Sequence, residues 1–104
     1  MERSYRIAAN GVLTYGRTLR LGSANFFVDD YTGVEGKHER GPTALLVMWR
    51  ADDPALPPQE ERVHVGQRLT FNGYEIIVVS VDDGGRFLEV EINQQGSKIP
   101  GRDA

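Results

Sequence analysis

The stretch VHVGQRLTFNGYEIIVVSV, which runs from Val63 to Val81, decides the fold of this chain. Asn72-Gly73 lies in its middle, between the alternating run Leu69–Phe71 and the β-branched run Tyr74–Val81. A two-residue Asn-Gly loop suits the type I′ turn, because both of its central residues need a positive φ and its twist matches that of antiparallel strands. The stretch therefore predicts a β-hairpin.

Two further dipeptides extend this pattern along the chain. Asn10-Gly11 and Asp83-Gly84 also lie between short runs of strand-forming residues, and no segment has the periodicity of a helix. Short strands joined by tight turns predict an all-β fold, either a small antiparallel barrel or a compact sandwich, of seven to eight short strands. We favour the barrel, because closure removes exposed strand edges. The stretch from Val63 to Val81 resembles the core of many small barrels and identifies no single family.

Alternation of apolar and polar residues predicts the strands, and glycine or proline marks their boundaries. The strands are Ser4–Ala9, Val12–Leu21, Ala24–Tyr31, Thr43–Arg50, Arg62–Val65, Leu69–Phe71, Tyr74–Val81 and a last strand containing Leu88, Val90 and Ile92. Gly22-Ser23 is expected to end a strand, and the polar stretches Thr32–Pro42 and Ala51–Glu61 are expected to be loops. One domain over residues 1–92 follows, with residues 93–104 as a flexible tail.

Two of these strands carry further information. Thr43–Arg50 is apolar at both parities, which predicts a central strand covered on both sides or one that contributes to an interface. One parity of Val12–Leu21 is occupied by large side chains that we expect on one face: Leu13, Tyr15, Leu19 and Leu21.

Composition limits the classes of function. The 104 residues carry a net charge of −3, which disfavours binding to the phosphates of nucleic acids. The chain has no cysteine, which excludes thiol nucleophiles, cysteine-ligated zinc and iron–sulfur clusters. The N-terminus leads into no apolar signal segment, and no apolar run approaches the roughly 20 residues of a membrane-spanning helix. We expect a cytoplasmic protein without membrane association.

Motifs for catalysis and metal binding are missing from the sequence. His38 and His64 are far apart in the chain and no H-x-H pair occurs, so neither a metal nor another cofactor is expected. Six of the seven aspartates form adjacent pairs at strand ends or turns, where aspartate bonds the local backbone. No serine lies in a G-x-S-x-G motif, and no phosphate-binding loop is present.

These observations favour a non-enzymatic interaction module that binds a protein partner or forms a homodimer. The alternative is a small-molecule-binding barrel, or a small cyclase- or isomerase-like enzyme, that acts through an apolar cavity. Exposed aromatic rings and the polar stretch Thr32–Pro42 suggest where binding takes place. The candidate binding residues are Phe27, Tyr31, His38, Arg40, Trp49, His64, Tyr74 and Phe87.

Overall fold

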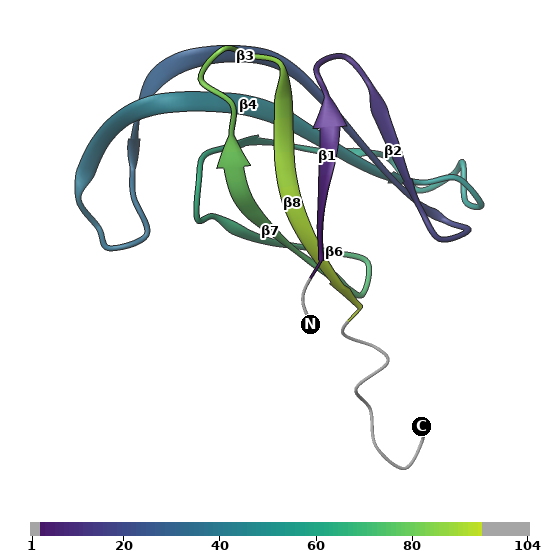
Figure 1. Cartoon of the computed structure of the whole chain (residues 1–104). Coiled ribbons are helices and arrows are strands. Elements are labelled where there is room, and N and C mark those ends of the chain that lie inside the picture. The colour runs from purple at the N-terminus through teal and green to yellow at the C-terminus, as the bar shows by residue number, and fades with distance from the viewer. Residues whose placement is uncertain (1–2, 95–104) are drawn as a thin grey trace.

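The computed structural model describes residues 3–94, and in this range the chain forms strands and no helix. The strands are β1 (Ser4–Ala8), β2 (Val12–Tyr15), β3 (Leu19–Thr32), β4 (His38–Arg50), β5 (Gln59–Val63), β6 (Arg68–Phe71), β7 (Tyr74–Val81) and β8 (Phe87–Gln94). They make two four-stranded antiparallel sheets, ordered β1-β8-β7-β6 and β2-β3-β4-β5 (Figure 1). The all-β prediction is confirmed. In the described part of the chain no helix is long and apolar enough to cross a membrane.

Neither sheet closes into a barrel over residues 3–94. The preference for a barrel is therefore not confirmed, whereas the alternative, a compact sandwich, fits the two sheets. Each sheet turns one apolar face toward a common core, as strands with a period of two require. The first sheet contributes Ile7, Leu69, Phe71, Ile76, Val78, Val81, Leu88, Val90 and Ile92; the second contributes Leu19, Leu21, Ala44, Leu46, Met48 and Val63.

The strand β4 is apolar on both faces, as predicted. Leu46 and its neighbours of the same parity are fully buried in the core, and the residues of the other parity are half-buried on the outer face of the sheet: Leu45, Val47 and Trp49. At Gly22 on β3, an added Cβ would lie 3.4 Å from Cζ3 of Trp49. The absence of a side chain at Gly22 thus lets the indole ring approach the backbone of β3 closely.

Only one of the three dipeptides makes the expected type I′ turn. Asn72 and Gly73 both have positive φ, 50° and 89°, and they join the paired residues Phe71 and Tyr74. At Asp83-Gly84 neither residue has a positive φ; the left-handed residue of this longer turn is Gly85, at 74°.

Asn10-Gly11 forms a turn, but not the predicted turn of a hairpin. Asn10 alone has a positive φ, 62°, and the amide of Gly11 donates to the carbonyl of Ala8. Since β1 and β2 belong to different sheets, this turn carries the chain from one sheet to the other and does not close a hairpin.

Several expected boundaries are wrong because strand pairing overrides local composition. Val12–Leu21 is a hairpin and not one strand: β2 ends at Tyr15, and a turn with Gly16 at φ 64° leads into β3. Gly22-Ser23 does not end a strand, since β3 continues to Thr32.

The two expected loops are also shorter than predicted. Most of Thr32–Pro42 belongs to β3 and β4, so that only residues 33–37 form the connection. The strand β5 begins at Gln59, inside the expected loop Ala51–Glu61, and ends before His64. The last strand extends to Gln94 and takes in the first two residues of the expected tail; residues 95–104 lie outside the described part of the chain.

Candidate interaction site

The longest two strands extend beyond the rest of the sandwich. The strand β2 pairs with β3 no further than Gly22, and β5 pairs with β4 only from Ala44 to Met48. From the pair Phe27–Thr43 outward, β3 and β4 therefore form strand pairs only with each other. We call residues 27–43 the arm; it curves away from the two sheets and ends in the turn 33–37 (Figure 1).

Each edge of the arm has one position that offers no free amide donor. The amide of Gly33 donates to the carbonyl of Lys37, so alternation turns positions 28, 30 and 32 of β3 and positions 38, 40 and 42 of β4 toward the free edges. The Asp29 carboxylate accepts the Asp30 amide at 2.8 Å, and Pro42 has no amide hydrogen. An occupied or missing donor interrupts the row of groups with which another strand would pair.

One face of the arm is held against the end of β5 and the loop after it. The Arg62 guanidinium lies 3.8 Å from the centre of the Phe27 ring and donates to Oγ1 of Thr43 at 3.0 and 3.2 Å. It also donates to the carbonyl of Asn25. Burial lowers the pKa of Arg62 and the nearby Asp29 carboxylate opposes this shift, so the side chain remains a cation.

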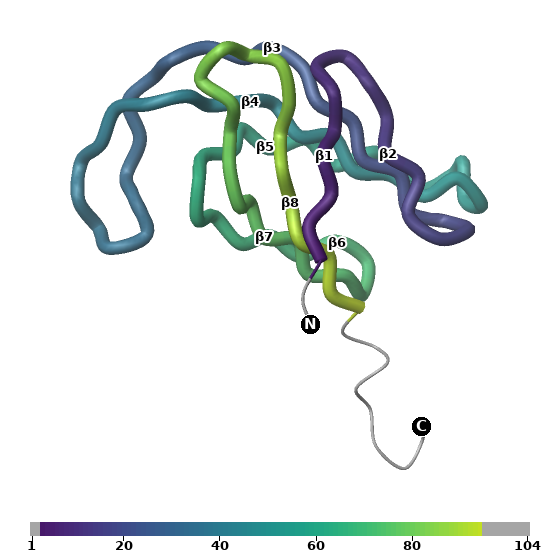
Figure 2. The backbone as a smooth tube through the Cα atoms, in the orientation of Figure 1, coloured from purple at the N-terminus to yellow at the C-terminus, as the bar shows by residue number. Residues whose placement is uncertain are grey.

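Two contacts further along complete this clamp face. The rings of Tyr31 and His64 stack at 4.2 Å with an angle of 10° between them. At the tip, an added Cβ on Gly66 would lie 3.0 Å from Cγ1 of Val34, which shows how closely the turn approaches the β5–β6 loop. The arm thus has a fixed orientation relative to the sandwich, and its backbone path can be followed in Figure 2.

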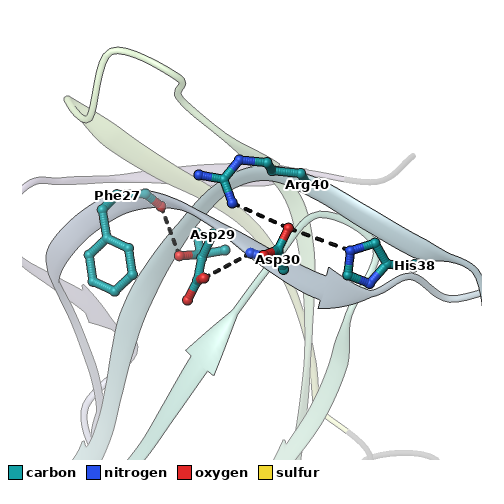
Figure 3. A network of polar contacts seen from close by, with 6 residues as sticks. Phe27, Asp29, Asp30, His38 and Arg40 are labelled. Carbon is teal, nitrogen blue, oxygen red and sulfur yellow. Dashed lines mark hydrogen bonds and ion pairs between the residues drawn. The ribbon is translucent and has the colours of Figure 1, made fainter.

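The opposite face, which we call the open face, carries Val28, Asp30, His38, Arg40 and Pro42. Oδ1 of Asp30 lies 3.2 Å from Arg40 and 3.5 Å from Nε2 of His38 (Figure 3). Half or more of each of these three side chains is exposed, so water screens their charges.

A pocket of about 140 Å³ lies where the arm leaves the sandwich. The arm side is lined by Phe26, Phe27, Val28, Pro42 and Thr43; the other side is the β7–β8 turn, Asp82, Asp83, Gly84 and Gly85. We call this the root pocket. An open hollow at the arm tip is lined by Thr32, Val34, His64, Gly66, Gln67 and Arg68.

The structure brings five of the eight predicted site residues to the arm or against it: Phe27, Tyr31, His38, Arg40 and His64. The other three lie elsewhere on the sandwich. Trp49 packs against Gly22, Tyr74 makes an edge contact with Tyr15, and Phe87 lies under the guanidinium of Arg6.

Arg62 and Val28 also belong to the arm contacts, and neither is among the residues predicted from the sequence. No local pattern marks Arg62, because its partner Phe27 comes from another strand and the register was unknown. The Asp82-Asp83 pair was interpreted as turn chemistry, and this holds for Asp82: its carboxylate accepts the backbone amide and the side chain of Arg86, which lowers the pKa of Asp82.

Among residues 3–94, no group of three or more histidine or carboxylate side chains is arranged to hold a metal ion. The arrangement at the arm is instead one of apolar, aromatic and charged side chains on an extended, two-stranded support. No protein-family model, curated protein or solved structure matches this chain. Its function is therefore argued from this geometry.

Proposed function

We propose that this protein is an interaction module that binds a protein partner, or a second copy of itself, through the arm. One observation carries the proposal. Five large apolar side chains are exposed in the described part of the chain, and four of them belong to the arm or to the loop beside its tip: Phe27, Val28, Val34 and Val65. Val34 exposes 70% of its surface, and Phe27 and Val28 expose 50% each. Phe27 lies on the clamp face and Val28 on the open face, so the arm exposes apolar surface on both faces. Exposed apolar surface concentrated in one part of a protein is typical of interaction surfaces.

The arm does not serve the hydrophobic core. None of the buried hydrophobic residues found in residues 3–94 lies between positions 27 and 43. Because the arm has no core contacts, other interactions must hold it in place. The contacts of the clamp face do so: Phe27 with Arg62, and Tyr31 with His64. Ordering before binding reduces the conformational entropy that association costs. The clamp thus supports a binding function for the open face.

Site-specific photo-crosslinking tests this proposal. The photoreactive residue p-benzoylphenylalanine replaces Val28 on the open face, and in a control chain it replaces Val12, an equally apolar and exposed residue on β2. We expect illumination in cells of the source organism to give a discrete protein adduct from position 28 and none from position 12. The mass of the adduct distinguishes a second copy from another protein. Equal labelling at both positions, or none at position 28, would contradict the proposal.

A further inference from the structure

The root pocket is lined by apolar residues of the arm root and by two aspartates of the β7–β8 turn, Asp82 and Asp83. Val28 and Pro42, which pair across the arm, form one wall. Phe26 continues the lining, and an added Cβ on Gly85 would lie 3.4 Å from Cβ of Phe26, so the β7–β8 turn packs directly on the arm root. The volume of about 140 Å³ is too small for a cofactor and large enough for one amino-acid side chain.

The charges around this pocket leave one carboxylate uncompensated. Asp82 is paired with Arg86 at 3.0 Å, and Asp30 on the neighbouring open face is paired with Arg40 at 3.2 Å. No described residue makes a hydrogen bond or an ion pair with the carboxylate of Asp83; Arg86 attracts it only at longer range. Arg62, which contacts the lining residues Phe27 and Thr43, has the nearby Asp29 carboxylate as its counter-charge. With these pairs counted, the local balance is one negative charge, which belongs to Asp83.

We propose that the root pocket receives a lysine side chain of the protein partner, with the ammonium group beside Asp83 and the methylene groups against Val28 and Pro42. This inference rests on the proposed function and identifies the chemistry that the arm recognises. A lysine carries a compact charge on an apolar stem of four carbons, which matches a pocket with apolar walls and one charged rim residue. An acidic side chain would meet Asp83, and a wholly apolar one would desolvate that carboxylate without compensation.

Titration with short peptides, followed by NMR of the backbone amides, tests the inference. The probes are the capped tripeptide acetyl-Ala-Lys-Ala-amide and the same peptide with norleucine, which has a stem of equal length and no charge. We expect the lysine peptide alone to shift the amides of Val28, Thr43, Gly84 and Gly85, with a dissociation constant of roughly millimolar order for so small a ligand. The affinity should fall as salt is added, because an exposed ion pair is screened.

Two variants make the assignment specific. Asp83→Asn should weaken binding of the lysine peptide by about fivefold, as expected for one partly exposed ion pair. Asp53→Asn is the matched control, since Asp53 also follows an aspartate that is paired with an arginine, in this case Asp52 with Arg50. It should leave the affinity unchanged.

Three results would overturn the inference: equal shifts with the norleucine peptide, shifts spread away from the pocket, or unchanged affinity in Asp83→Asn. None of these touches the crosslinking result at position 28. A partner adduct without lysine binding would leave the proposed function in place and refute only the lysine pocket. Loss of both would refute the interaction module itself.

Discussion

At the scale of single residues, backbone conformation explains which glycines matter. Gly73 has φ at 89° with no other atom within 4 Å of an added Cβ, so the cost of a side chain there is purely conformational. We expect Gly73→Ala to lower the free energy of unfolding by about 1–2 kcal/mol, the cost of placing an L-residue in the left-handed region. Gly41→Ala is the control, because Gly41 lies in a strand without a positive φ and an added Cβ would make only an ordinary contact. Urea denaturation measures both; equal effects would contradict this reasoning.

Another single residue links stability to pH. The side-chain hydrogen bond from Arg86, followed by the backbone amide of Arg86, lowers the pKa of Asp82 below its ordinary value of 3.8. The carboxylate therefore stabilises the fold fully above the unfolded-state pKa, and this contribution is lost as pH falls through the folded-state pKa. We expect Asp82→Asn to lose less stability between neutral pH and the acid range below 3.8 than the wild type does. Urea unfolding at the two pH values measures this, and an unchanged difference would contradict it.

At the scale of elements, the sequence predicted which residues share a face better than it predicted where strands begin and end. Leu13, Tyr15, Leu19 and Leu21 do share a face, but as the cross-strand pairs Leu13–Leu21 and Tyr15–Leu19 of a hairpin. Facing residues of a hairpin keep the same parity as residues along one strand, so parity alone could not reveal the turn at Gly16.

The arm was missed for a related reason. Alternation of apolar and polar residues marks a strand only where one face is buried. Residues 29–41 are outside the core, so Thr32–Pro42 has the composition of a loop, although Thr32 and residues 38–42 lie in the paired strands β3 and β4. His38 and Arg40 are predicted as loop residues, but both lie on β4 in the arm. Their separation from Trp49, Tyr74 and Phe87 depends on strand register, which one sequence does not define.

The protection of the arm edges gives a prediction for this element. The double variant Asp29→Ala with Pro42→Thr removes the carboxylate that occupies the Asp30 amide and adds an amide at position 42. Each edge then gains one free donor and its row of amides is no longer interrupted, so we expect association of arms into β-structure that binds thioflavin T. The control is Asp53→Ala with Pro57→Thr, in the loop between β4 and β5. Equal thioflavin signals from the two variants would contradict the assigned role of these edges.

At the scale of the whole molecule, the packing of two sheets predicts that truncation of adjacent residues on β4 destabilises the fold to different extents. Leu46 is fully buried between the sheets, whereas Leu45 is half-buried on the outer face. Leu46→Ala should lower the free energy of unfolding by about 2–5 kcal/mol, as for other large-to-small changes in a core, and Leu45→Ala by clearly less. Thermal or urea unfolding tests this. Similar losses would contradict the assignment of the inner and outer faces of β4.

The proposal that the two sheets provide stability and the arm provides binding can be tested by a competition experiment. In an arm-shortened chain, the dipeptide Asn-Gly replaces residues 28–42. It forms a two-residue turn between Phe27 and Thr43, as Asn72-Gly73 does between Phe71 and Tyr74. Because the arm contributes nothing to the core, this chain should keep a cooperative unfolding transition. The decisive measurement is the yield of the photo-adduct from position 28 in the presence of excess unlabelled competitor. The account predicts that the wild-type chain suppresses the adduct and that the folded arm-shortened chain does not; equal suppression by both would contradict it.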